Sequence, residues 1–182
     1  MIELKLKMKT ARNITERYKI KIAELPLGLS ESNFVLDNDL FSYFNHPYVE
    51  KGTVEVKVIL DKRPNLIEVN IALTGSLEVQ CDRCLDYFLY PIDASEIILY
   101  TIGQQDEHEN ENVVVITKEQ SIIDLSSDLY EIAVTQLPIS KVHPNNEQGL
   151  PLCNPEMLEL LNKYLVNEEQ INPTQKLSDI IK

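Results

Sequence analysis

The feature that most constrains the fold is a long run of alternating apolar and polar residues that ends in two closely spaced cysteines. Residues 66–80 place apolar side chains at nearly every second position, the pattern of a β-strand with one buried face. Cys81 and Cys84 follow directly, and the β-patterned residues 87–90 come next. We therefore expect the two cysteines at the tip of a hairpin, where a tight turn brings both thiols to the same side of the backbone.

Other short runs also predict strands. An alternating run at residues 54–60 is joined to residues 66–80 by the turn-forming segment 61–65, which predicts a hairpin. Gly75, inside the second run, is expected to mark a bulge or a bend. The remaining β-patterned runs are residues 18–23, 34–36, 87–90, 96–102 and 113–116, with a break expected at Pro91 between the third and the fourth.

The apolar period then changes from that of a strand to that of a helix. Residues 125–137 place their apolar side chains on one helical face, with Asp124 positioned to cap the start and Pro138 to end the helix. A shorter helix is predicted at Asn154-Pro155, a capping side chain followed by proline at the first helical position. Strands that precede the helices predict an α+β fold: a mainly antiparallel, strongly twisted sheet with one long helix packed on it and short C-terminal helices.

Length and charge indicate how the chain is organised. Its 182 residues favour a single α+β domain, expected at residues 15–165, between a basic N-terminal arm at 1–14 and a tail with a short helix at 166–182. Residues 1–21 carry a net charge of +5 in a chain whose net charge is −12, so the remainder carries −17. An acidic body favours basic partners over nucleic acid, while the basic N-terminal residues could touch RNA.

The cysteine count and the apolar segments indicate the compartment. No apolar stretch approaches the roughly 20 residues that cross a bilayer, and the first nine residues interleave apolar with charged side chains, unlike a secretion signal. Three cysteines, an odd number, argue against a disulfide framework and for a reducing compartment. We expect a cytoplasmic protein that does not contact membranes.

Four side chains from two segments form a candidate metal site. Structural zinc takes four cysteine or histidine ligands, often as a close pair from one loop and the rest from elsewhere. Cys81 and Cys84 supply the pair, and the loop after the long helix supplies His143 and Cys153. In an alternative interpretation, Cys153 is a buried apolar residue and His143 caps a turn. A redox role for the cysteine pair is less favoured, because thioredoxin-like pairs begin at a helix N-terminus and both flanks here are β-patterned.

Three blocks of the chain resemble, in the same order, the large ribosomal RNA subunit accumulation proteins, also called YceD-like and long catalogued as a domain of unknown function. The likeness covers roughly residues 15–165. Many relatives have a second close cysteine pair where this chain has His143 and Cys153. The blocks are Gly75…Cys81-Asp82-Arg83-Cys84-Leu85, Asp124-Leu125…Tyr130-Glu131…Leu137-Pro138 and His143-Pro144…Cys153-Asn154-Pro155-Glu156.

The resemblance implies a non-enzymatic factor in large-subunit ribosomal RNA accumulation and ribosome assembly. With the acidic body, it predicts a basic ribosomal protein or an assembly particle as partner, and ribosomal RNA contact through the N-terminal basic segment. Two alternatives stay open: a thiol-redox protein that uses Cys81 and Cys84, and an acidic chaperone of a ribosomal protein that needs no RNA. We predict no catalytic residues and no small-molecule substrate, since the five glycines are scattered singly and form no phosphate-binding loop.

Overall fold

A computed structural model of the protein describes residues 14–49, 51–103, 113–117 and 119–165. Its described residues divide into two units. The first is drawn from Met1–Val79 and Tyr87–Ile139, and the second from Gln80–Asp86 and Ser140–Lys182. Apart from Ile14, the predicted arm at 1–14 and the tail at 166–182 lie outside the described residues. The single domain expected over residues 15–165 stays a prediction.

A long hairpin forms the centre of the first unit. Strands β3 (Lys51–Arg63) and β4 (Leu66–Gln80) are antiparallel and paired from Lys51↔Glu78 to Arg63↔Leu66. This confirms the hairpin predicted from the two alternating runs. Burying an aliphatic side chain contributes about 1.5–3 kcal/mol, so the shared face is a main source of stability. Side chains of this face that are at most 2% exposed are Val54, Val56, Val58, Leu60, Ile67, Val69, Ile71, Leu73, Leu77 and Val79.

Gly75 marks a close approach of two strands. The pairing of β3 with β4 continues without a bulge through Val54↔Gly75, so of the two expected features, a bulge or a bend, the bulge is wrong and the bend stays a prediction. A Cβ atom at this position would overlap the carbonyl oxygen of Thr53 and lie 2.6 Å from the Cα atom of Val54. Glycine is needed because the neighbouring backbone occupies the space of a side chain.

The edge strand β2 (Gly28–Leu36) was predicted only in part. It pairs with β3 along its whole length, whereas the apolar pattern indicated residues 34–36 alone. Its half-buried positions include Ser30 and Ser32, while Leu29 points outward and is 75% exposed. Because hydroxyl side chains take the inward positions, the strand lacks the alternation from which it could have been recognised.

Two further strands complete a five-stranded sheet in the order β2-β3-β4-β5-β6. β5 (Tyr87–Ile102) and β6 (Val113–Ile116) are parallel, so the sheet is mainly antiparallel with one parallel pair. β5 runs through Pro91 without the expected break. β6 pairs only with Leu99–Ile102, so around Pro91 one side of β5 faces no strand among the described residues. Proline is tolerated at such an edge because its missing N–H is not needed for a hydrogen bond there.

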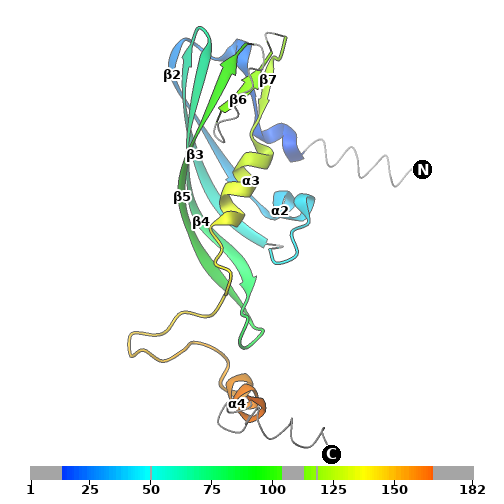
Figure 1. The fold of residues 1–182 in the computed structure, drawn as a ribbon, viewed down its shortest axis with the longest axis vertical. Helices are drawn as coiled ribbons and strands as arrows, with labels where there is room; N and C mark the ends of the chain where they lie inside the picture. The colour runs from blue at the N-terminus through cyan, green and yellow to red at the C-terminus, as the bar shows by residue number, and fades with distance from the viewer. Residues whose placement is uncertain (1–13, 50, 104–112, 118, 166–182) are drawn as a thin grey trace, which may run out of the picture. The chain divides into compact units, whose positions relative to one another are not determined.

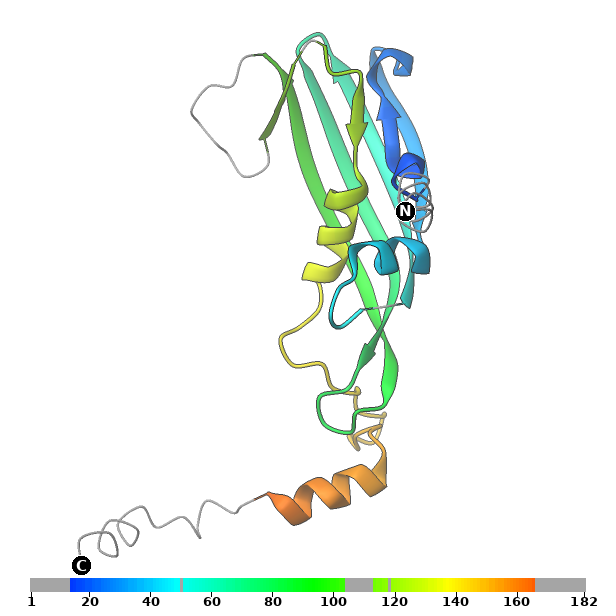
Figure 2. The same ribbon diagram turned by 90° about the vertical axis from the view of Figure 1, so that its right-hand side faces the viewer.

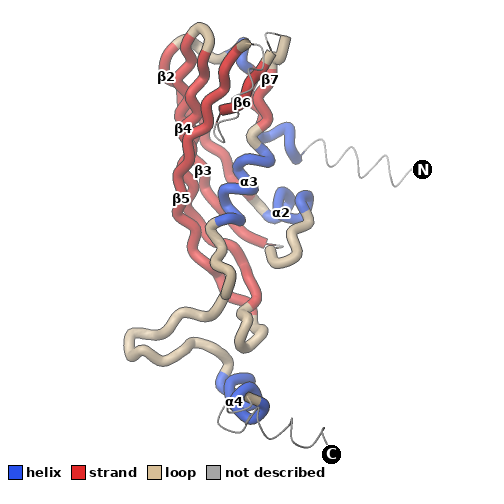
Figure 3. The backbone as a smooth tube through the Cα atoms, in the orientation of Figure 1, coloured by secondary structure: helices blue, strands red, loops and turns tan. Residues whose placement is uncertain are grey.

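Helices and a small second sheet cover one face of this sheet (Figures 1 and 2). They are α2 (Asn38–Phe44), α3 (Ser126–Thr135) and the antiparallel pair of β1 (Lys19–Lys21) with β7 (Ile122–Asp124). The predicted strand at 18–23 is reduced to β1, because 3-10 turns form on both sides of it. The opposite face carries none of this unit's described helices (Figure 3).

The start of α3 differs by one residue from the sequence pattern, and its end agrees. The N-cap is Leu125, not the predicted Asp124, although the carboxylate of Asp124 accepts hydrogen bonds from the backbone N–H and the hydroxyl of Ser126, at 3.0 and 2.6 Å. The helix ends before Pro138. With ten residues it is no longer than α4 (Pro155–Tyr164), so the expectation of one long helix is not confirmed. The strong twist of the sheet stays a prediction.

Aromatic and polar contacts fix α3 in the first unit. Tyr130 stacks on Phe44 of α2 with 4.2 Å between ring centroids, and the hydroxyl of Tyr100 on β5 donates to Asp128 at 3.2 Å. The helix is thereby tied both to its neighbour and to the sheet. Among the described residues, no helix has the length and apolarity of a membrane span.

Candidate metal centre

The first half of the site is the turn that follows β4. The backbone N–H of Leu85 donates to the carbonyl oxygen of Cys81, and the N–H of Cys81 donates to that of Asp86, both at 2.9 Å. Leu85 has a φ of 64°, in the left-handed region that glycine usually occupies, although its side chain is 55% exposed. This tight path carries Cys81 and Cys84 on one side of the turn. Nothing in the residue types around Leu85 indicated this left-handed backbone conformation.

The second half is the loop between Ser140 and α4. The backbone N–H of Leu152 donates to the carbonyl oxygen of Pro144 at 3.1 Å, which closes the loop and brings His143 and Cys153 to the same end. Asn154 then caps α4 through its side chain, with proline at the first helical position, as predicted. The helix therefore starts directly after Cys153.

Asp82 and Lys141 join the turn to the loop. The N–H of Asp82 donates to the carbonyl oxygen of Lys141 at 2.7 Å, and the N–H of Lys141 donates to the carboxylate of Asp82 at 2.6 Å. The ammonium group of Lys141, on a side chain only 11% exposed, lies 3.5 Å from the same carboxylate. This pair holds the loop in place two residues before His143. Sequence reasoning missed it, although an acidic residue between the two cysteines was an available signal.

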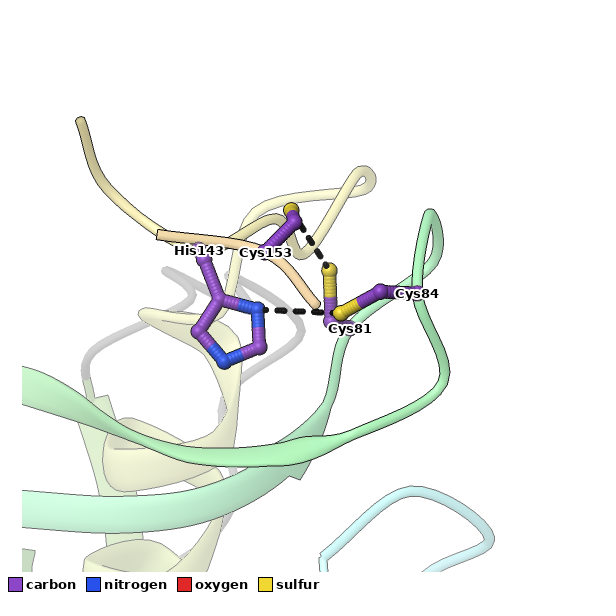
Figure 4. Close-up of side chains that lie close together, drawn as sticks. All are labelled: Cys81, Cys84, His143 and Cys153. Atoms are coloured by element: carbon purple, nitrogen blue, oxygen red, sulfur yellow. Dashed lines mark hydrogen bonds between the residues drawn. The ribbon is translucent and has the colours of Figure 1, made fainter. Parts of the chain in front are cut away.

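The structure brings together all four side chains of the predicted set (Figure 4). Their candidate ligand atoms lie within 4.8 Å of one another. The sulfur atoms of Cys81 and Cys153 are 3.8 Å apart, and the sulfur of Cys84 is 3.4 Å from Nδ1 of His143. The three cysteines are buried and free, and all four residues belong to the second unit.

The donor set fits a tetrahedral zinc ion. Metal bonds of about 2.3 Å to sulfur and about 2.0–2.1 Å to nitrogen place two sulfurs about 3.8 Å apart, and sulfur and nitrogen about 3.6 Å apart. The distances of 3.8 Å between sulfurs and 3.4 Å between sulfur and nitrogen agree with this geometry. Since the protein supplies all four ligands, the arrangement suits a structural site without an open position for a reacting water.

The sulfurs of Cys81 and Cys153 have opposite electrostatic environments. Burial acts to raise the pKa of the Cys81 thiol, but the backbone N–H groups of Cys84, Arg83 and His143 outweigh it and lower this pKa to about 6. Burial raises the pKa of the Cys153 thiol to about 11, and its contacts with the other two sulfurs add to the effect. Cys81 is therefore prepared to bind a cation as a thiolate, whereas Cys153 must lose a proton on binding.

Comparison with known proteins relates the chain to a protein family. The model of a family described as large ribosomal RNA subunit accumulation protein YceD matches residues 69–180, which include both halves of the candidate metal centre and α4. No curated protein and no solved structure matches the chain.

Proposed function

The chain belongs to the YceD family of large ribosomal RNA subunit accumulation proteins, and we propose that it acts there as a non-enzymatic assembly factor that binds a basic ribosomal protein. The observation that carries the proposal is the distribution of charge. Beyond residue 21 the chain has a net charge of −17, which attracts basic polypeptides and repels phosphates.

The described basic residues near the N-terminus support a protein partner over RNA. Each of them forms an ion pair with a neighbouring carboxylate, which partly neutralises it towards phosphate. The other four cations of residues 1–21 precede the described residues and are the candidates for a supplementary contact with ribosomal RNA. The ion pairs are Arg17 with Asp37 at 2.7 Å, Lys19 with Glu16 at 2.6 Å and Lys21 with Glu24 at 2.8 Å.

In this proposal the four residues of the candidate metal centre bind zinc. The ion would supply a cross-link between the turn at Cys81 and Cys84 and the loop that carries His143 and Cys153. Metal analysis of freshly purified protein should find one zinc per chain, and Cys153→Ser should lower this ratio strongly. A full complement of zinc in that variant would show that the metal is held elsewhere.

The deciding experiment is capture of assembly particles by the tagged full chain, with and without ribonuclease. We expect a ribosomal protein to stay bound after ribonuclease treatment, and binding to weaken as salt screens the charges. Deleting residues 1–12 should leave this association largely intact. Loss of all binding on ribonuclease treatment or on that deletion would make the protein an RNA-binding protein instead.

Neutralising acidic residues beyond residue 21 tests whether their charge attracts the ribosomal protein. Glu55, Asp93 and Glu96 are exposed carboxylates on β3 and β5, and replacing them by Gln, Asn and Gln should weaken ribosomal-protein binding without unfolding the sheet. A variant with neutral changes in the same sheet, Thr53→Ser and Thr74→Ser, serves as control. Equal binding by both variants would contradict an electrostatic role for this surface.

A thiol-redox role is the second candidate, because the pKa of the Cys81 thiol is lowered to about 6. In the structure Cys81 follows β4 and does not begin a helix, so the lowered pKa comes from N–H groups of the turn, at Cys84 and Arg83, and from His143 of the loop. Thiol titration of freshly purified protein separates the two functions. A zinc protein should show three reactive thiols only after chelation, whereas a redox protein with Cys81 and Cys84 oxidised should show one thiol after denaturation and three only after reduction.

A further inference from the structure

Helix α4 exposes most of its apolar face. Met157 and Leu158, in its first turn, are half-buried, and the apolar residues that follow are exposed. Their exposed fractions are 48% for Leu160, 37% for Leu161, 70% for Tyr164 and 58% for Leu165. A contiguous exposed apolar stripe of this kind on a helix is typical of a surface that binds another protein.

The charges beside this stripe identify the partner. At about 100° per residue, the six apolar side chains of residues 157–165 fall within an arc of about 160°. Glu156 and Lys163 lie together along one edge of the arc, about 10.5 Å apart along the helix axis. The other edge is uncharged, and Glu159 points away from the arc. The edge therefore carries one acid at its N-terminal end and one base at its C-terminal end. When two such helices pack antiparallel, the acid of each helix lies beside the base of the other.

We propose that α4 packs against α4 of a second copy of this chain, in an antiparallel pair about a two-fold axis. Glu156 of each copy then faces Lys163 of the other, and the two ion pairs are equivalent by symmetry. Within the described part of the chain neither residue forms an ion pair of its own. The ammonium group of Lys163 lies 5.8 Å from the ring centroid of Tyr164, beside the apolar stripe.

The register set by the charges also matches the apolar residues. When Glu156 faces Lys163, Leu161 lies at the level of Leu158 of the second copy. The two Leu160 side chains then lie next to the axis. The leucines near the centre of the helix thus meet leucines rather than charges.

Other occupants fit this surface less well. RNA requires clustered cations, and α4 carries one lysine and two glutamates. A basic segment of another protein would meet one base and one acid along the charged edge, which gives no net attraction. A ten-residue helix spans only about 15 Å, so the pair is a small interface, and we expect dissociation constants of about 10 µM or weaker.

Sedimentation velocity of the full chain in zinc-containing buffer tests the proposal. The wild type should change from monomer to dimer as concentration rises through the micromolar range. Glu156→Lys and Lys163→Glu, each alone, replace attraction by repulsion at two symmetric places and should weaken the dimer roughly tenfold or more. An equimolar mixture of the two variants restores both ion pairs and should dimerise like the wild type, as should the double variant.

Two matched variants complete the design. Glu159→Lys makes the same charge change on the opposite side of the helix and should leave the dimer unchanged, whereas Leu161→Asp should abolish it. A wild type that stays monomeric at every concentration overturns the proposal. So does a dimer that none of the α4 substitutions weakens, because it would form through another surface.

Discussion

Replacing Asp82 by alanine should weaken zinc binding although Asp82 is not a ligand. The change removes the 2.6 Å hydrogen bond from the backbone N–H of Lys141 and the carboxylate beside its nearly buried ammonium group. A hydrogen bond to a charged acceptor contributes about 1.5–3 kcal/mol, and we take about 1.5–2 kcal/mol because solvent reaches the carboxylate, whose side chain is 43% exposed. Each 1.4 kcal/mol is a factor of ten, so zinc affinity should fall about 10–30-fold.

Competition with a chromophoric zinc chelator at fixed pH measures this loss. Asp82→Asn retains an acceptor for the N–H of Lys141 and should lose less than tenfold. Asp86→Ala removes an exposed carboxylate from the same turn, one whose side chain makes no hydrogen bond among the described residues, and should bind zinc like the wild type. If Asp82→Ala is folded and binds zinc within threefold of the wild type, the loop is positioned without this pair and the reasoning is refuted.

Three further outcomes are expected. Gly75→Ala should lower the unfolding free energy by about 3 kcal/mol in denaturant titrations, because its Cβ meets the backbone of β3, whereas Gly103→Ala should be nearly neutral since its Cβ would meet nothing within 4 Å. Zinc binding at pH 7.5 should release a proton from Cys153, whose thiol pKa of about 11 keeps it protonated there, and calorimetry in buffers of different ionisation enthalpy should detect this proton. Zinc affinity measured at several pH values should therefore rise with pH. Cys81, with a pKa of about 6, should release a proton on zinc binding only at lower pH. Leu85→Gly should leave zinc affinity unchanged and raise the unfolding free energy by up to about 1 kcal/mol, because glycine adopts a φ of 64° without strain; a decrease would show that the leucine side chain contributes packing.

Strands with one fully apolar face were predictable from the sequence, and strands without one were not. β3 and β4 alternate because one face of the hairpin is buried along its length. Only the end of β2, residues 34–36, was recognised, since Ser30 and Ser32 take its inward positions, and an edge strand is held by hydrogen bonds to its neighbour that leave no trace in side-chain chemistry. Gly75 was recognised as special, but a close backbone approach and a bulge call for the same residue.

At the candidate metal centre, chemistry was predictable and positioning was not. Three cysteines and a histidine in two segments are a rare set, so their residue types alone suggested that the segments meet. The pairing of Asp82 with Lys141 joins residues 59 positions apart, and although the place of Asp82 between two cysteines was a signal, nothing near Lys141 marks it as the partner. Such contacts follow from the path of the whole chain between them.

The separation of the two halves of the candidate metal centre along the chain gives the metal a second effect. The sulfurs of Cys81 and Cys153 come from positions 72 residues apart, so an ion that binds both closes a large loop containing residues 87–139. Those residues supply β5, β6 and α3 of the other unit. A cross-link around a loop of this length reduces the entropy of the unfolded chain by an equivalent of about 4 kcal/mol at 25 °C. Chelation should therefore lower the melting temperature of the sheet, although none of its strands provides a ligand.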